Sequence, residues 1–320
     1  MKKKLLSFMA VALMLLSLCA CKEKETAQIR VGSLKGPTSM GLVYLMELSD
    51  DGKALGNYSF EMATAADEIL PKMISGDLDI ALVPANVASI LYKKSNENVT
   101  VIDINTLGVL YAVSADKTIE MIDDLEGKTI YLTGKGTTPD FVLSYLLNKA
   151  GLDTSNVQIE YKSEPTEVAA ILANDDTAVG ILPQPFVTAA TKQNENLSVV
   201  LDLTKEWDNV SDTGARLVTG VTVVRNDFLK DHKKEVETFI NEHKESADYV
   251  NQNPDEAAEL IVKTGIIEKA PIAKLAIPYC NITCISGGEM KEALKGYLSE
   301  LYNIDPASVG GALPSDSFYY

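Results

Sequence analysis

Apolar and polar positions along the chain follow two periods, and their alternation predicts strands connected by helices. The run 29–33 (IRVGS) is strand-like, and the segment 37–49 has apolar residues at the i, i+3, i+4 spacing of a helix. The run 129–134 (TIYLTG) and the segment 138–151 repeat this strand, turn and helix. Near-continuous apolar strands flanked by helices are typical of a parallel sheet covered on both faces. The pattern therefore predicts an α/β fold.

The same pattern occurs in two copies. The turn at 33–36 (SLKG) has its counterpart at 133–136 (TGKG), and the helix, turn and strand of 68–84 have theirs at 167–183. The two offsets differ by a single residue, which indicates an internal repeat rather than a chance match. We therefore expect two similar α/β lobes.

Two extended runs are expected to connect the lobes. The run 99–117 would leave the first lobe and the run 214–227 would return to it, and two such connections make a hinge. The first lobe is then expected at 28–110 together with 224–320, whose C-terminal part is mostly helical. The second lobe is expected at 111–223.

The N-terminus is typical of a secretory signal peptide. Basic residues at 2–4 precede an apolar stretch at 5–20, and Cys21 is followed at once by charged residues. The stretch is shorter than the roughly 20 residues of a membrane-spanning helix, so we expect residues 1–20 to be removed. The residues before Cys21 resemble a bacterial lipobox, which predicts lipidation of Cys21, a linker at 21–27 and a location on the outer face of the cell membrane. An ordinary cleaved signal is the alternative.

Composition excludes several classes of function. The chain has 45 acidic and 29 basic residues, a net charge of −16, so nucleic acid is not an expected partner. Cys280 and Cys284 could form a local disulfide or remain thiols, and two cysteines are too few ligands for zinc. His232 and His243 lie in a charged helical stretch and are expected at the surface. No catalytic residue, metal ion or cofactor is therefore expected.

Two glycine-containing turns are the strongest candidates for a binding site. Each of the segments 33–40 and 133–138 joins the end of a strand to the start of a helix, and parallel-sheet proteins bind ligands at that end of their strands. Thr138, Pro139 and Asp140 make a good helix start, whose free N–H groups suit an anion. The spacing of a nucleotide-binding Walker loop is absent. The alternative is that both turns are tight connections with no ligand.

Further candidates lie beside these turns. Asn86 and Gln184 follow matched strands and offer both donors and acceptors, and Phe186 could provide an apolar wall. Local packing is the alternative for each. Arg216 could clamp a ligand carboxylate, although pairing with an acidic residue is the stronger expectation. Trp207 has no role that the sequence indicates.

The complete set of predicted ligand-binding residues is Ser33, Lys35, Gly36, Thr38, Ser39, Met40, Thr64, Asp67, Asn86, Tyr111, Thr133, Lys135, Thr137, Thr138, Gln184 and Phe186.

Three segments carry a resemblance to a known family. The segments 124–153, 164–190 and 304–320 resemble the substrate-binding lipoproteins of ABC importers of the nitrate, sulfonate and taurine type, which are related to thiamine-precursor binding proteins. The resemblance implies a type II periplasmic-binding-protein fold, with a ligand between two lobes joined by two crossover segments. It places the ligand loops at 33–40, 64–67, 84–86, 133–138 and 184–186.

The resemblance implies a monomeric, lipid-anchored receptor that closes on a small solute and delivers it to an ABC permease and its ATPase. The expected solute is a small anion, such as a sulfonate, taurine or nitrate, and the close second is a thiamine-precursor pyrimidine. A different class is an enzyme on the same fold, like the menaquinone-pathway dehydratases. The pyrimidine synthases of this superfamily rely on histidine and a cysteine-rich motif that this chain lacks, which argues against an enzyme. A third class is a sensor subunit for a membrane kinase.

Overall fold

The computed structural model describes residues 27–152, 155–211 and 214–320. The predicted signal peptide, the predicted lipidation site at Cys21 and all but the last residue of the predicted linker lie outside these ranges. Within the described ranges, no helix has both the length and the apolar character needed to cross a membrane.

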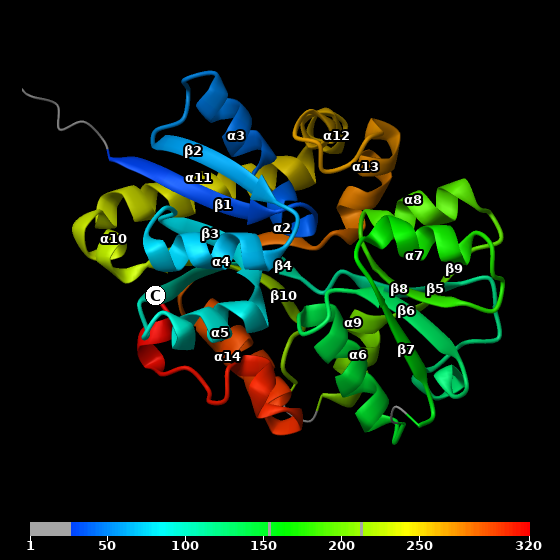
Figure 1. Cartoon of the computed structure of the whole chain (residues 1–320). Helices are drawn as coiled ribbons and strands as arrows, with labels where there is room; N and C mark the ends of the chain where they lie inside the picture. Colours follow the sequence, from blue (N-terminus) through cyan, green and yellow to red (C-terminus); the bar gives the residue numbers. More distant parts are fainter. Residues whose placement is uncertain (1–26, 153–154, 212–213) are drawn as a thin grey trace, which may run out of the picture.

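Two separate sheets form the centres of two lobes, which lie side by side in Figure 1. The first sheet has the strand order β11-β4-β10-β3-β1-β2, and the second has the order β7-β6-β8-β5-β9. The first contains β1 (Gln28–Leu34), β2 (Asn57–Ala63), β3 (Ile80–Pro84), β4 (Val99–Leu107), β10 (Val218–Arg225) and β11 (Ile282–Ile285). The second contains β5 (Leu110–Ser114), β6 (Thr129–Thr133), β7 (Gln158–Lys162), β8 (Val179–Pro183) and β9 (Ser198–Asp202).

The internal repeat is visible in how the strands pair. In the first sheet, β1 pairs in parallel with β2 and β3, and β10 runs antiparallel to β3. In the second sheet, β6 pairs in parallel with β7 and β8, and β5 runs antiparallel to β8. The matched segments of the sequence therefore occupy equivalent places in the two sheets, and the predicted two-lobed α/β fold is confirmed.

Two connections link the sheets. Strand β4 ends at Leu107 in the first sheet and β5 begins at Leu110 in the second, so the chain crosses at 108–109. It returns before Val218, where β10 joins the first sheet, a few residues earlier than the predicted boundary at 223. The exact lobe boundaries stay a prediction.

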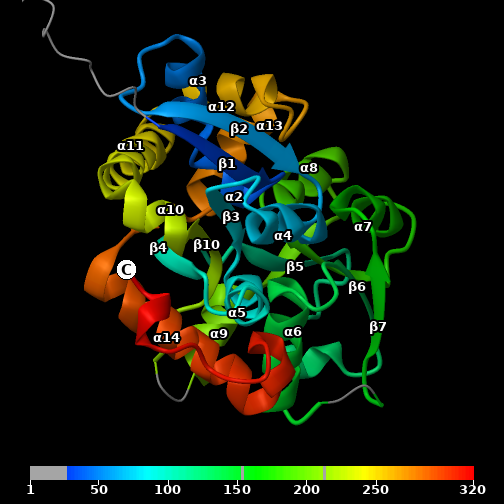
Figure 2. The same ribbon diagram turned by 60° about the vertical axis from the view of Figure 1, so that its left-hand side comes forward.

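Helices cover both sheets, and the C-terminal ones return to the first lobe (Figure 2). Helix α11 packs against α3 and β11, α14 packs against β4 and β10, and α13 reaches α8 of the second lobe. The helices of the repeat are α2 (Pro37–Met40), α3 (Val43–Asp50), α4 (Ala66–Ser75), α5 (Ala85–Lys94), α6 (Thr138–Lys149), α7 (Pro165–Leu172) and α8 (Phe186–Gln193). The others are α9 (Leu203–Val210), α10 (Asn226–Asp231), α11 (Lys233–Gln252), α12 (Pro254–Lys263), α13 (Ala270–Ala276) and α14 (Gly287–Ile304).

The helix predicted at 37–49 is divided in two at Gly41. A Cβ on Gly41 would lie 3.1 Å from Cγ2 of Ile282, so the chain passes here close to β11. Contact with a strand from the far end of the sequence cannot be inferred from local periodicity. The break leaves α2 as a separate single turn that follows β1.

Trp207 is a core residue at the junction of the lobes. Its ring stacks on Tyr145 of α6, with 4.2 Å between ring centroids, and Tyr297 of α14 lies at 5.4 Å. Its Nε1–H donates to the carbonyl of Ala215, 2.6 Å away, on the returning connection. Trp207 is fully buried, so the role that the sequence did not indicate is to join α6, α9, α14 and that connection.

The surface position predicted for His243 is wrong. His243 is fully buried, and its Nδ1 lies 3.2 Å from Oδ2 of Asp103, which is also fully buried. Helix α11 has a polar composition, but one of its faces packs on the first sheet and carries His243 inward.

The structure also decides between the disulfide and the two thiols that the sequence left open, because Cys280 and Cys284 are both free thiols.

Candidate functional site

A cavity of about 580 Å³ lies between the two lobes. Its walls come from both halves of the repeat, from the residues between β4 and β5 and from a loop before α13. The first half contributes Leu34, Lys35, Pro37, Thr38, Thr64, Ala65, Ala66 and Pro84. The second half contributes Thr133, Gly134, Thr137, Thr138, Pro139, Ser163, Glu164, Pro165, Thr166, Pro183, Phe186, Ala189, Lys192 and Gln193. The remaining lining residues are Val109, Leu110, Thr219, Gly265, Ile266, Ile267, Glu268, Lys269 and Ile272.

Helix N-termini from both lobes converge on this cavity. In the first lobe, α2 begins at Pro37, α4 begins at Ala66, and Pro84 is the N-cap of α5; all three residues line the cavity. In the second lobe, α6, α7 and α8 also begin at residues that line the cavity. The first N–H groups of a helix have no partner inside the helix, and the helix dipole is positive at that end. The cavity is therefore suited to an anionic or acceptor-rich group.

The turn at 133–136 in the second lobe is held by the carboxylate of Asp140. Gly134 and Gly136 both have φ values in the left-handed region, 76° and 73°, which glycine adopts without strain. Thr137 is the N-cap of α6, one residue earlier than expected, and its hydroxyl donates to the carbonyl of Gly134 at 2.6 Å. Asp140 accepts from the N–H of Gly136 at 2.8 Å and from the hydroxyl of Tyr161 at 2.7 Å. Burial and this carboxylate raise the pKa of Tyr161, so the tyrosine remains a donor.

The matching turn in the first lobe is closed mainly by its own hydroxyl groups. Ser39 donates to the carbonyl of Leu34 at 2.5 Å and lies 2.8 Å from the hydroxyl of Ser33. Thr38 also donates to Leu34, at 3.1 Å, and lines the cavity. Ser33 and Ser39 are buried outside the lining, so they shape the turn without facing the cavity.

Charge in the cavity is opposite to that of the whole chain. Lys35, Lys192 and Lys269 line it together with Glu164 and Glu268, whereas the chain as a whole carries −16. Among the described residues, the lining contains no arginine, histidine or cysteine. An anion here would be held chiefly by helix N-termini, hydroxyls and ammonium groups.

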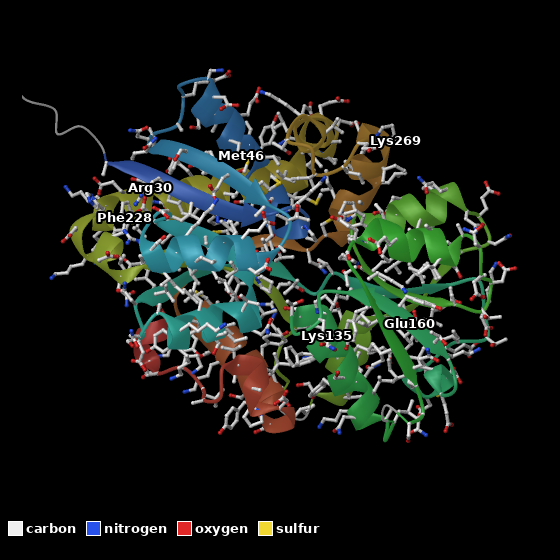
Figure 3. All side chains as sticks on the ribbon, in the orientation of Figure 1. Arg30, Met46, Lys135, Glu160, Phe228 and Lys269 are labelled. Atoms are coloured by element: carbon white, nitrogen blue, oxygen red, sulfur yellow. The ribbon has the colours of Figure 1, made fainter. Side chains whose placement is uncertain are left out.

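The structure brings only part of the predicted site residues to the cavity. The predicted residues that line it are Lys35, Thr38, Thr64, Thr133, Thr137, Thr138 and Phe186. Those outside the lining are Ser33, Gly36, Ser39, Met40, Asp67, Asn86, Tyr111, Lys135 and Gln184. Met40 is fully buried in a core cluster, and the Tyr111 hydroxyl donates to the carbonyl of Tyr279 at 3.3 Å. Lys135, which is labelled in Figure 3, has its Nζ 5.1 Å from the centroid of the Tyr161 ring.

Asn86 and Gln184 both follow matched strands but have different partners. Asn86 is fully buried and donates to the carbonyls of Gly136 and Ser308, both at 3.2 Å. Gln184 accepts from the hydroxyl of Thr188 at 2.8 Å, within its own lobe. Asn86 therefore links α5 of the first lobe to the TGKG turn of the second.

Several lining residues were missed by sequence reasoning. Segment 163–166 is the repeat counterpart of the predicted loop 64–67, so the same offset would have found it. The loop 265–269, whose Lys269 is labelled in Figure 3, has no counterpart in the repeat and no local signal. Arg216 does not line the cavity. It pairs at the surface with Glu289, 3.0 Å away, and pairing with an acidic residue was the stronger of the two expectations for it.

The chain matches a known family model and is similar to known binding proteins. A family model described as "Menaquinone biosynthesis" matches residues 30–302. A Brucella abortus (strain 2308) protein named only as a binding protein is 24% identical over 196 residues, which cover 61% of this chain. The match spans 58% of that protein's length, and a Brucella suis binding protein matches to the same extent.

Solved structures show the same fold. A crystal structure of an ABC transporter from Parabacteroides distasonis has a TM-score of 0.77 and 23% identity, over 91% of this chain and 98% of that one. The periplasmic aliphatic sulphonate binding protein SsuA from Escherichia coli has a TM-score of 0.71 and 16% identity, over 90% and 92%. The alkanesulfonate-binding protein SsuA from Xanthomonas axonopodis pv. citri, bound to MOPS, has a TM-score of 0.68 and 14% identity, over 92% and 97%. The periplasmic-binding-protein fold implied by the resemblance is confirmed.

Proposed function

The chain belongs to the family described as "Menaquinone biosynthesis", and from its periplasmic-binding-protein fold and its interlobe cavity we propose that it is the solute-binding component of an ABC importer. It captures a small organic anion in the interlobe cavity and presents it to the permease and its ATPase. The membrane is reached through a lipid on Cys21, on the outer face of the cell, and the protein acts as a monomer.

The convergence of helix N-termini on the cavity supports this proposal most strongly. Each N-terminus stabilises a nearby negative charge by about 0.3 to 1 kcal/mol, and more where the site is partly buried. Lysine rather than arginine supplies the cationic groups in the lining. A ligand held from both lobes at once stabilises the closed arrangement, which is the form a permease would recognise.

The walls favour an organic sulfonate such as taurine or an alkanesulfonate over nitrate. A cavity of about 580 Å³ is in the size range of sites for whole organic ligands. Phe186, Ile267 and Ile272 add apolar surface to the lining. Such a lining accommodates a charged head with an attached carbon chain, which nitrate lacks. Phe186 is the only aromatic residue among the described lining residues, so a thiamine-precursor pyrimidine would lack a second ring to stack on.

An enzyme of menaquinone biosynthesis is the second candidate, and the family description favours it. The ionisable groups that line the cavity are Lys35, Glu164, Lys192, Glu268 and Lys269. For acid–base catalysis, one of these carboxylates or ammonium groups would have to exchange a proton with the substrate. An enzyme would release an altered molecule, whereas a receptor would release its ligand unchanged.

A thermal-shift screen of the purified protein tests the proposal. The panel contains taurine, alkanesulfonates, nitrate, carboxylates and an aminopyrimidine, each followed by mass spectrometry of the released small molecule. A ligand at about 100 times its Kd stabilises the folded state by about 2.7 kcal/mol. We expect the largest shift with a sulfonate and recovery of that sulfonate unchanged. A shift with the pyrimidine alone, or conversion of any compound, would overturn the proposal.

Lys35 and Lys135 provide a matched test of the cavity, since they occupy equivalent positions in the two turns. Lys35 lines the cavity, whereas Lys135 lies over Tyr161. We expect Lys35→Met to weaken the affinity for the anion about threefold, the size of a partly exposed charge interaction. Lys135→Met should leave that affinity unchanged. Calorimetric titration of both variants measures this, and an equal effect of the two substitutions would contradict the assignment.

A further inference from the structure

A cluster of metal-ligating side chains lies in the core of the first lobe, away from the cavity. Asp103 of β4, His243 of α11 and Cys284 of β11 each offer one ligand atom, and these atoms all lie within 4.8 Å of one another. None of the three lines the interlobe cavity. The cluster therefore needs an explanation that the proposed function does not supply.

The charge of Asp103 is the central difficulty of this cluster. Its side chain is fully buried, and a buried carboxylate is costly unless it is compensated. One oxygen accepts from the hydroxyl of Thr222 at 2.7 Å, and the other lies 3.2 Å from Nδ1 of His243. A protonated histidine at this position would make a buried ion pair, which often returns less energy than its desolvation costs.

The spacing of the donor atoms suits one shared cation. Zinc bonds of about 2.0 to 2.3 Å in a tetrahedral arrangement put neighbouring ligand atoms about 3.3 to 3.8 Å apart. The 3.2 Å between Oδ2 of Asp103 and Nδ1 of His243 is close to that separation. The third ligand atom, Sγ of Cys284, lies within 4.8 Å of the other two, so a small inward movement of this atom would complete the set of three ligands.

We propose that Asp103, His243 and Cys284 bind one divalent transition-metal ion of the zinc class. Imidazole nitrogen, thiolate sulfur and carboxylate oxygen together are a ligand set typical of zinc. As the metal–sulfur bond forms, the thiol proton passes to solvent. Cys284 is only partly buried, which leaves an approach for the ion from outside. The ion would join α11 to β4 and β11, three elements that are distant in the sequence.

Cobalt substitution tests the site directly, because a thiolate bound to Co²⁺ gives a near-ultraviolet charge-transfer band. The untagged, reduced protein is titrated with Co²⁺, and its zinc content is measured by mass spectrometry. We expect one Co²⁺ per chain and a charge-transfer band in the wild type. Cys284→Ala should abolish the band and lower Co²⁺ affinity by more than about tenfold, since removing even a group that only supports a ligand costs about that much.

Cys280→Ala is the matched control. Cys280 is a neighbouring free thiol that is fully buried and donates to the carbonyl of Ala276, so this variant should keep the band. Absence of the band in the wild type overturns the proposal even if Cys284→Ala fails to fold. A band that survives in Cys284→Ala, or equal loss in both variants, also overturns it. None of these outcomes depends on whether the cavity binds a sulfonate.

Discussion

Replacing Trp207 by alanine is expected to lower the free energy of unfolding by about 3 to 5 kcal/mol, the usual cost of removing a large buried aromatic side chain. The indole is fully buried and stacks on Tyr145, and it also contacts Tyr297. Its loss would open a cavity where α6, α9 and α14 meet. It would also leave the carbonyl of Ala215 without its donor.

Urea denaturation followed by circular dichroism measures this loss, because the substitution removes the only tryptophan. Trp207→Phe is the control, since it keeps an aromatic ring and removes the Nε1–H donor to Ala215. Leaving that carbonyl unpaired should cost about 1 to 3 kcal/mol. A loss below about 1 kcal/mol for Trp207→Ala would contradict the role assigned to Trp207 at the junction of the lobes.

Replacing Asn86 by alanine is expected to cost about 1 to 3 kcal/mol of stability, because the buried carbonyl of Ser308 loses its donor. The substitution also removes the hydrogen bond to the carbonyl of Gly136, which belongs to the second lobe, whereas Ser308 belongs to the C-terminal segment. The link between α5 and the TGKG turn would be lost. We therefore also expect a ligand-free protein that is more open, and a weaker affinity for the ligand, by about fivefold for each kcal/mol of closure lost.

Gln184→Ala separates this effect from a general loss of packing. Gln184 is also buried and also follows a strand of the repeat, but its side chain bonds to Thr188 within one lobe. Small-angle X-ray scattering of the ligand-free proteins should show an increased radius of gyration for Asn86→Ala only. The interlobe role of Asn86 would be excluded if both variants had the wild-type radius.

The fold could be predicted from the sequence because its signals are local and repeated. Buried strands such as β3 and β8 are continuous apolar runs, and each is followed by a helix. The same strand, turn and helix recur in matched segments, so the assignment of each element in one copy is supported by its counterpart in the other. This repetition predicted both lobes and the two glycine-containing turns that line the cavity.

The candidate site could be predicted only in part, because side-chain direction depends on contacts between distant segments. Asn86 and Gln184 each follow a matched strand of the repeat, yet only Asn86 turns to Ser308 near the C-terminus. His243 lies in a charged stretch, yet it meets Asp103 on strand β4 of the first sheet. The loop 265–269 lines the cavity through its position in the fold alone. None of these contacts leaves a pattern in the neighbouring residues.

The most direct measurement of the central claim compares an alkanesulfonate with the uncharged sulfonamide of the same carbon chain, by isothermal titration calorimetry on the wild-type protein. Helix N-termini and lysines that converge on one cavity should favour the anion by at least about 1.4 kcal/mol, a factor of ten in Kd. We expect one sulfonate per chain and binding of the sulfonamide at least tenfold weaker. Equal affinities for the two compounds, or no binding of the sulfonate, would contradict the account.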